Sequence, residues 1–453
     1  MSLFIVGLDN TIVNVALPTI HRDLHASVSE LQWTIDAYTL VLASLLMLSG
    51  STADRLGRAR VFKVGLAVFT LGSLLCSVAP GTELLIAARM LQAIGGSMLN
   101  PVAMSIIRNT FTDPRERAQA IGVWGGVIGL SMALGPVLGG ALVEGIGWRS
   151  VFWVNVPVGL AAILLTARFV PESRAQHARR PDVVGQILVL ALLACLTYGI
   201  IEAPSAGWLS AQTLGLFALA GVAAAALIAY EPRREDPLIE LRFFRSAPFS
   251  GATLIAVSAF VGLSGFLFLN TLYLQQARGL SPLEAGLYLL PMAAITVVVG
   301  PLSGRVVGRV GARPSLVLGG AGLCLGALML TGLTPTTPTA WLFAAYVVFG
   351  IGFGAVNPPI TNTAVSGMPP AQAGVAAAVA STSRQVGASL GIAIIGAVAV
   401  AGAGSPSALA AAGHVGWWII AGCGAVVLAL GVLTTTRWAL STAAAVGVQD
   451  AAA

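Results

Sequence analysis

The sequence predicts an all-α integral membrane protein. Of its 453 residues, 57% are hydrophobic and only 9% are charged, whereas soluble domains carry about 25% charged residues. Long apolar runs alternate with short arginine-bearing segments. This alternation indicates many membrane-spanning helices of about 20 residues each, because a backbone in lipid must satisfy its own hydrogen bonds. A β-barrel is excluded, since it would show alternating segments of about 10 residues.

Apolar segments follow one another along the whole chain. The first is not a cleavable signal peptide, because no basic segment precedes it and Asp9, Asn10 and Asn14 interrupt it. It starts almost at Met1, so we expect a few residues of a cytoplasmic leader to be missing. The fourteen predicted spans lie at 2–21, 33–53, 61–79, 84–107, 118–144, 150–170, 183–203, 211–230, 249–276, 282–303, 314–333, 339–362, 372–402 and 415–437.

Basic residues orient these spans, because positively charged side chains collect in cytoplasmic loops. With both termini in the cytoplasm, 19 of the 24 lysine and arginine residues fall inside and three (Arg22, Arg149 and Arg278) fall outside, while Arg89 and Arg384 lie within spans. One missed or extra helix would destroy this asymmetry. The formal charge of +6 therefore indicates membrane orientation and contact with anionic lipid, and it does not indicate a nucleic-acid surface.

The chain also repeats itself. The basic turn GSTADRLGRAR at 50–60 follows the second span, and the similar GPLSGRVVGRVGAR at 300–313 follows the tenth. Two parallel six-helix halves joined by an inserted pair of helices would produce this spacing. We therefore expect an N-terminal bundle at 1–170, an inserted pair with cytoplasmic linkers at 171–248, and a C-terminal bundle with a short tail at 249–453.

No cofactor or metal site is expected. The four cysteines, Cys76, Cys195, Cys324 and Cys423, lie inside apolar runs, which favours a packing role over disulfides or metal ligation. The segment GIGFGA at 350–355 follows no strand, so it is interpreted as helix packing and not as a dinucleotide-binding loop. The chain has no phosphate-binding loop of the form GxxxxGK[ST], so any transport must use a gradient and not ATP bound to this chain.

Two acidic residues stand inside apolar spans, Asp9 in the first and Asp36 near the start of the second. A charge in such a place costs roughly 2.5–3.5 kcal/mol on insertion scales. Burial favours the protonated form of a carboxyl group, so a buried carboxyl group can exchange protons near neutral pH. We therefore predict that both couple transport to protons, with Arg89 in the fourth span as their counter-charge. The alternatives are a polar helix end for Asp9, a solvated entrance for Asp36 and a purely structural role for Arg89.

Further polar and aromatic side chains within the spans are candidates for a substrate cavity, because aromatic rings can stack on flat or cationic ligands. Any single aromatic side chain also has a simpler interpretation as packing or as part of the interfacial belt. The candidates are Asn14, Gln32, Trp33, Tyr38, Gln92, Asn100, Trp124, Asn270, Tyr273, Asn357 and Arg384. The second half has no acidic residue well inside the membrane, so proton coupling is expected in the first half.

Six motifs occur in order along the chain: LDNTIVNVALPTI, LQWTIDAYTL, GSTADRLGRAR, ARMLQAIGGSMLNP, GVIGLSMALGPVLGG and WRSVFWVNVPVG. Together they resemble the major facilitator superfamily, and more closely its fourteen-span drug:proton antiporter branch. The resemblance covers nearly the whole chain. It implies the major facilitator fold, with two six-helix bundles plus two inserted helices. It also implies that Arg89 faces the cavity and takes part in proton transfer, although Ala93 stands at a usual glycine position.

The same resemblance implies a role for the turn after the second span. It would act as a latch between domains that stabilises the outward-facing state. Its glycines permit a tight turn and its acid can pair with guanidinium groups. The second copy has Gly304 in place of Asp54, so the latch is assigned to the first half; the alternative is an ordinary basic turn. The predicted latch residues are Gly50, Asp54, Arg55, Gly57 and Arg58.

The fifth span carries the motif that the family associates with exporters. Its glycines would form a groove for a neighbouring helix, and its proline would bend the span by removing a backbone donor. Generic packing of small residues is the alternative. The motif residues are Gly126, Gly135, Pro136, Gly139 and Gly140.

These observations predict a secondary active transporter without enzymatic activity that exports amphipathic or cationic drug-like molecules in exchange for protons by alternating access. We expect a monomer in the bacterial inner membrane, with both termini cytoplasmic and with lipid, a small-molecule substrate and protons as its partners. Three alternatives stay open: an exporter of an endogenous metabolite or antibiotic, a facilitator-type importer or symporter, and a membrane sensor that binds a ligand without moving it.

Overall fold

The computed structural model describes residues 2–111, 113–174, 182–234, 237–365, 373–400 and 406–443. Throughout these ranges the regular secondary structure is helical. The chain packs into two compact units, described separately here: unit 1 comprises Met1–Ala194 and Leu280–Leu287, and unit 2 comprises Cys195–Gly279 and Tyr288–Ala453. The three-part division expected from the sequence, with limits at 170 and 248, stays a prediction.

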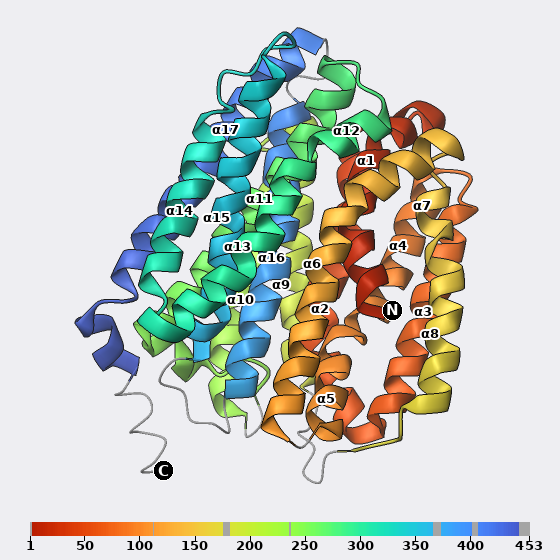
Figure 1. The fold of residues 1–453 in the computed structure, drawn as a ribbon. Coiled ribbons are helices and arrows are strands. Elements are labelled where there is room, and N and C mark those ends of the chain that lie inside the picture. Colours follow the sequence, from red (N-terminus) through yellow and green to blue (C-terminus); the bar gives the residue numbers. More distant parts are fainter. Residues whose placement is uncertain are drawn as a thin grey trace. The chain divides into compact units, whose positions relative to one another are not determined.

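Unit 1 contains the helices drawn from red to yellow in Figure 1, together with one short helix from later in the chain. They are α1 (Ser2–Leu24), α2 (Val28–Leu56), α3 (Arg58–Ser77), α4 (Thr82–Ser97), α5 (Asn100–Thr110), α6 (Pro114–Gly145), α7 (Ser150–Trp153), α8 (Asn155–Phe169), the first half of α9 (Val183–Ala206) and most of α12 (Pro282–Tyr288).

Helix α2 shows how local sequence sets the ends of an element. At its start, the Glu30 backbone N–H donates to Ser27 Oγ at 3.2 Å, and the Ser27 N–H donates to Glu30 Oε2 at 2.7 Å, which forms a capping box. The helix stops before Gly57, whose φ of 114° is readily adopted only by glycine. These ends fix the register that buries Thr34, Asp36 and Tyr38.

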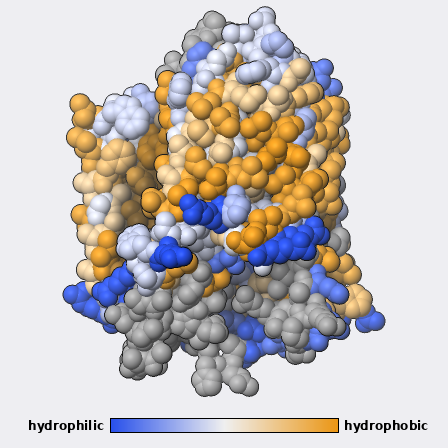
Figure 2. All heavy atoms as spheres, turned by 60° about the vertical axis from the view of Figure 1, so that its left-hand side comes forward, coloured by the Kyte–Doolittle hydropathy of each residue, from blue (hydrophilic) through white to orange (hydrophobic). Residues whose placement is uncertain are grey.

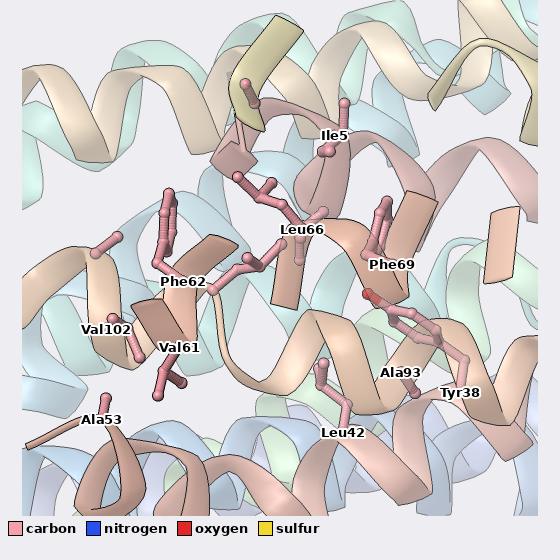
Figure 3. Close-up of a cluster of buried hydrophobic side chains, with 14 residues drawn as sticks. Ile5, Tyr38, Leu42, Ala53, Val61, Phe62, Leu66, Phe69, Ala93 and Val102 are labelled. Carbon is pink, nitrogen blue, oxygen red and sulfur yellow. The ribbon is translucent and has the colours of Figure 1, made fainter. Parts of the chain in front are cut away.

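A cluster of apolar side chains forms the core of unit 1 (Figure 3). Ile5 of α1, Leu42 of α2, and Leu66 and Phe69 of α3 are all at most 1% exposed. The ring of Tyr38 reaches the same cluster, and its hydroxyl lies beside Gly96 of α4. Because lipid is as apolar as these side chains, close packing and not exclusion from water holds the cluster together.

Proline residues interrupt three of the predicted spans. The fourth predicted span is divided into α4 and α5 before Pro101, the sixth into α7 and α8 before Pro157, and the tenth into α12 and α13 before Pro291. A proline removes one backbone donor, and its ring clashes with the carbonyl group four residues earlier. In each case the helix breaks within the four residues that precede the proline. A count of apolar residues cannot detect such a break.

Unit 2 contains the second half of α9 and most of the later helices. They are α10 (Ala211–Tyr230), the 3₁₀ turns η1 (Glu231–Arg233) and η2 (Leu241–Arg245), α11 (Ala247–Leu272), the π-helical turn η3 (Tyr273–Ala277), α13 (Leu290–Val310), α14 (Arg313–Leu328), α15 (Thr339–Val365), α16 (Ala373–Val400) and α17 (Pro406–Leu433).

Glycines and aromatic rings bring the helices of unit 2 together. A Cβ at Gly326 of α14 would lie 2.8 Å from the backbone of Phe349 on α15, so the glycine permits close contact there. The ring of the same Phe349 stacks on Phe266 of α11 at 4.3 Å between centroids, and Trp417 of α17 meets Phe266 edge-on. These contacts form the interior of the unit.

Among the described residues, ten helices are long and apolar enough to cross a membrane. Figure 2 shows hydrophobic side chains over much of the visible face, with hydrophilic ones gathered toward its lower part. The predicted spans at 2–21, 118–144, 314–333 and 372–402 are helical as α1, α6, α14 and α16 but fall outside those ten. The structure therefore establishes a helical protein with multiple apolar spans, and the number fourteen stays a prediction.

Candidate functional site

A buried ion pair lies between the first and fourth predicted spans. The Arg89 Nη1 of α4 donates to Asp9 Oδ2 of α1 at 2.5 Å, and the two side chains are 1% and 0% exposed. Two charges so far from water are tolerated only when each is paired and hydrogen-bonded. The structure thus brings together two of the three residues predicted to couple transport to protons.

Amide side chains complete the hydrogen bonding of Asp9. Gln92, one turn after Arg89 on α4, donates from Nε2 to Asp9 Oδ1 at 2.9 Å and to Ser73 Oγ at 2.8 Å. Asn155 of α8 donates to the same Asp9 oxygen at 3.2 Å. With Arg89, three donors converge on one carboxylate group.

The guanidinium group of Arg89 is held on its other sides as well. Its Nη1 also donates to Gln92 Oε1 at 2.7 Å, and its Nε donates to the Thr34 carbonyl oxygen of α2 at 3.0 Å. The ring of Tyr38 lies 4.2 Å from the guanidinium carbon, within the range of a cation–π contact. Arg89 therefore links α4 to both α1 and α2.

Close packing between α3 and α4 makes this network possible. A Cβ at Gly72 would lie 2.6 Å from the Gln92 backbone nitrogen, and one at Gly95 would lie 2.8 Å from the Phe69 Cα. Small residues at such contacts let helix backbones approach closely. This contact brings Ser73 of α3 within reach of Gln92.

Sequence reasoning identified Asp9, Arg89, Gln92 and Tyr38 but missed other members of the network. Asn155 is a single polar residue in the apolar run VFWVNVPVG, a signal that could have been used. Ser73 and the Thr34 carbonyl group gave no such signal, because serine is common in membrane helices and every residue has a carbonyl group.

Asp36, the third predicted coupling residue, is completely buried on α2. The Thr39 hydroxyl donates to its Oδ1 at 3.0 Å. The structure therefore does not place this carboxylate in a solvated entrance; it lies within helix packing.

The other candidates in unit 1 differ in environment. Gln32 and Asn14 are buried, and Asn14 Nδ2 donates to the Asn10 carbonyl oxygen at 3.2 Å. Trp33 and Asn100 are half-buried, and the buried acceptor Asn100 Oδ1 receives no hydrogen bond from the part of the chain that the structure describes. The side chain of Trp124 lies outside the part of the chain that the structure describes.

In unit 2, two of the candidates are occupied by structural contacts. Asn270 Nδ2 donates to the Phe266 carbonyl oxygen at 3.0 Å, and its Oδ1 accepts from the Tyr346 hydroxyl at 2.5 Å. The Tyr273 hydroxyl donates to the Thr334 carbonyl oxygen at 2.6 Å. Asn357 is exposed on α15, and Arg384 of α16 donates to the Thr361 hydroxyl at 2.5 Å.

The predicted latch lies at the junction of α2 and α3. Arg58, the first residue of α3, pairs with Asp54 of α2 at 2.8 Å across the break at Gly57, while Arg55 is exposed. Gly57 is needed both for its φ of 114° and for space, since a Cβ there would lie 2.7 Å from Glu172 Oε1. At Gly50 the nearest atom to such a Cβ is Pro101 Cβ at 3.7 Å, so the space there does not require glycine.

Glu172, which sequence reasoning did not single out, caps this junction from the end of the sixth predicted span. Its two carboxylate oxygens accept from the backbone N–H groups of Ala59 and Arg60, each at 3.0 Å, and the Arg58 N–H donates to the Ser173 carbonyl oxygen at 2.9 Å. A carboxylate at the first turn of α3 also complements the helix dipole. The segment after α8 is therefore attached to the predicted latch.

The glycine motif of α6 packs against two different segments of unit 1. A Cβ at Gly135 would overlap the Thr11 hydroxyl of α1, and one at Gly139 would lie 2.8 Å from Ile12 Cγ1. One at Gly140 would lie 2.6 Å from the Cα of Leu283, on α12. The groove thus holds α1 two to three residues after Asp9. The surroundings of Gly126 lie outside the described residues.

Pro136 of the same motif does not end α6, which continues to Gly145. Its carbonyl oxygen lies against Gly286 of α12, where there is no room for a side chain. The Glu144 carboxylate accepts from the Leu283 N–H at 3.3 Å. This end of α6 is therefore joined to α12 by both packing and hydrogen bonding.

Comparison with known proteins gives a consistent set of similarities. The sequence profile of the Major Facilitator Superfamily matches residues 1–392. The multidrug resistance protein Stp of Mycobacterium tuberculosis (strain CDC 1551 / Oshkosh) is 36% identical over 401 residues, which cover 88% of this chain and 74% of that protein.

Two further relatives have similar coverage. The tetracenomycin C resistance and export protein of Streptomyces glaucescens is 38% identical over 400 residues, or 87% of this chain and 74% of that protein. The multidrug efflux pump LfrA of Mycolicibacterium smegmatis is 35% identical over 398 residues, or 88% of this chain and 79% of that protein.

Proposed function

The chain belongs to the major facilitator superfamily, a family of membrane transporters for small molecules, and from this premise we propose that it exports amphipathic or cationic drug-like compounds in exchange for protons. The names of its relatives, which include a multidrug resistance protein, a multidrug efflux pump and an antibiotic export protein, support export as the direction of transport. The buried Asp9–Arg89 pair is the observation that supports proton coupling.

We assign the protein to the cytoplasmic membrane of a bacterium, as a monomer with fourteen spans and both termini in the cytoplasm. The bacterial relatives and the distribution of basic residues support this assignment. Transport would proceed by alternating access, in which two six-helix bundles rock about a central site. Gly50, Asp54, Arg55, Gly57 and Arg58 would form the latch of one state.

Protonation of Asp9 is the proposed coupling step. A proton that enters from outside neutralises the carboxylate, and Arg89 loses its counter-charge while it keeps its bonds to Gln92 and Thr34. Because Asp9 and Arg89 lie on α1 and α4, loss of the pair weakens a connection between these helices. Asp36 would serve as a second proton-exchanging carboxylate on α2.

The membrane potential supplies work when the exchange is electrogenic, that is, when more positive charge enters than leaves. Each net charge that moves inward across 100 mV then releases about 2.3 kcal/mol, enough to concentrate a substrate outward many-fold. The proposed substrate-cavity residues are Asn14, Gln32, Trp33, Tyr38, Gln92, Asn100, Trp124, Asn270, Tyr273, Asn357 and Arg384.

Export can be tested in inverted membrane vesicles, with and without a protonophore, using a panel of fluorescent amphipathic cations and antibiotics. Wild-type protein should accumulate substrate in vesicles whose interior is acidic, and the protonophore should abolish this accumulation. Asp9→Asn should lose the response to the proton gradient, because an amide cannot carry the exchanged proton. Asp23→Asn, which changes an exposed acid on the same helix, should behave as the wild type.

Two results would contradict the proposal. Accumulation that is insensitive to the protonophore, or an Asp9→Asn variant with full proton-driven transport, would remove the assigned coupling site. Movement of substrate out of the vesicles would indicate an importer. The tetracenomycin C relative also favours a second candidate, export of one endogenous antibiotic, which a response to a single compound of the panel would support.

A further inference from the structure

Arg384 is an arginine deep within an apolar helix of unit 2. It lies 11 residues after the start of α16 at Ala373, which corresponds to roughly 16 Å along the axis at 1.5 Å per residue. A cation in the middle of a membrane helix costs roughly 2.5–3.5 kcal/mol on insertion scales, so such residues are rare and usually functional.

The direction of Arg384 follows from the packing of its own helix. Gly387 and Gly391 of α16 contact the backbone of Val257 and Val261 on α11, where a Cβ would be about 2.9 Å from either Cα. Residues 384, 387 and 391 share one face of a helix by their spacing. Arg384 therefore points into the helix bundle and not toward lipid.

Arg384 has few polar contacts for a half-buried cation within a membrane helix. Its Nη2 donates to Thr361 Oγ1 of α15 at 2.5 Å, and its buried Nε has no hydrogen-bond acceptor among the described residues. Within the described ranges, the ion pairs are Arg58–Asp54, Arg89–Asp9 and Arg242–Glu240, and none includes Arg384. Arg89 shows how this protein compensates a buried guanidinium group elsewhere, with a carboxylate and two further acceptors.

The neighbouring surface of α15 combines polar and aromatic groups. Phe353, Asn357 and Thr361 follow one another at intervals of four residues, so they share a face. Phe353 meets Phe260 of α11 edge-on, with 5.4 Å between ring centroids. Phe353 is only 3% exposed, whereas Phe260 is half-buried. A ligand in this region would therefore find the Phe260 ring at one end and the Arg384 guanidinium group at the other.

We propose that Arg384, positioned by Thr361, binds an ionised acidic oxygen of the transported molecule, a carboxylate or a phenolate carried on an aromatic ring system. The inference deepens the proposed function and rests on it, because it extends the substrates from cations to amphipathic acids. The ligand supplies the missing counter-charge to the planar guanidinium group, and its rings lie toward Phe260. A rigid cation gains nothing at this position, since it would meet a like charge.

The test uses the full-length protein in lipid nanodiscs and two dyes that share a flat xanthene ring system. Fluorescein is an anion with a carboxylate and a phenolate at mildly alkaline pH, and rhodamine 6G is a cation. Binding is measured by fluorescence polarisation. Arg384→Gln should weaken fluorescein binding roughly tenfold or more. It should not weaken rhodamine 6G binding, because it removes a positive charge that would repel the cation. Arg384→Lys should retain part of the affinity, because it keeps the charge but not the fork of donors.

Arg437→Gln is the matched control, since it removes an exposed cation of unit 2 and changes the net charge by the same amount. It should leave the binding of both dyes unchanged. If Arg384→Gln fails to fold, as judged by size exclusion, competition on the wild type replaces it: naphthoate should displace fluorescein, and the uncharged naphthamide should not.

Equal binding of fluorescein to the wild type and a folded Arg384→Gln variant, no binding to the wild type, or equal displacement by naphthoate and naphthamide would each overturn the inference. Proton-driven export of rhodamine 6G alongside any of these results would leave the proposed function intact. Charge-dependent fluorescein binding without proton-driven movement of either dye would instead retain the site and reject the function.

Discussion

At the residue scale, Asp9 is the centre of the polar network in unit 1. Its carboxylate receives hydrogen bonds from Arg89, Gln92 and Asn155, which come from α4 and α8. Breaking a buried pair on one side leaves the other charge uncompensated, at a cost of about 3–5 kcal/mol. The same pair is thus a structural contact and a place where one proton changes the energy of helix packing.

A double-mutant cycle separates the pair from its surroundings. Asp9→Asn and Arg89→Gln should each lower the melting temperature of the purified protein, because each leaves one buried charge without its partner. The double variant should be more stable than the sum of the single effects predicts, by at least about 1 kcal/mol. The measurement is thermal unfolding in detergent, and strictly additive effects would mean that the pair contributes no coupling energy.

Sequence could predict the members of this network that carry a charge. Asp9 and Arg89 are conspicuous in apolar runs because the membrane penalises ions. Ser73 contributes through its position on α3, which depends on the approach of α3 to α4 at Gly72. That approach is a property of three-dimensional packing, so the contact between Ser73 and Gln92 could not be read from the linear pattern.

At the element scale, glycines determine which helices can touch. In α6, Gly135 and Gly139 contact α1 at Thr11 and Ile12. These contacts hold α6 beside the part of α1 that follows Asp9. Loss of either glycine would push α1 away from α6 and disturb the carboxylate indirectly.

Gly135→Ala should therefore destabilise the protein by about 1–3 kcal/mol, because the new methyl group overlaps Thr11. Gly221→Ala is the control: apart from the local backbone of α10, no atom of the described residues lies within 4 Å of a Cβ at that position, so alanine should be neutral or stabilise by roughly 0.5–1 kcal/mol. Melting temperatures of both variants give the comparison. A Gly135→Ala protein as stable as Gly221→Ala would show that α1 does not pack in this groove.

The cap of α3 gives a second prediction for an element. Glu172→Ala should lower stability by about 1 kcal/mol, as expected for a lost helix cap, and should increase hydrogen exchange at Ala59 and Arg60. Glu83→Ala serves as a control, because Glu83 is likewise an exposed acid but lies in the first turn of α4 and not at the start of α3. It should leave exchange in α3 unchanged. Unaltered exchange in the Glu172→Ala variant would count against the cap.

At the scale of the whole molecule, the distribution of basic residues predicts which loops face the cytoplasm, and this topology can be tested. In a cysteine-free background, Arg174→Cys should react with a membrane-impermeant thiol reagent only from the cytoplasmic side, and Thr336→Cys only from the outer side. Both positions are exposed. Reaction of the two variants from the same side would reject the predicted number of spans between them.

The sequence predicted the helical class and the family correctly, because composition and motif order are properties of the whole chain. The number of membrane spans is harder to predict from the sequence. Helix α1 carries a buried acid and α14 extends only from Arg313 to Leu328, so a rule based on length and apolar composition accepts neither. Such helices are held by their neighbours and not by their own hydropathy.

The short segment Leu280–Leu287 packs with unit 1, although the chain on both sides of it belongs to unit 2. It is bounded by Gly279, with a φ of 68°, and by the break at Leu289 between α12 and α13. Any movement between the units that keeps this segment docked must be absorbed by bending at these two joints. The segment would then act as a tether with a pivot at each end, and stiffening either pivot would slow the transport cycle without altering a single ligand contact.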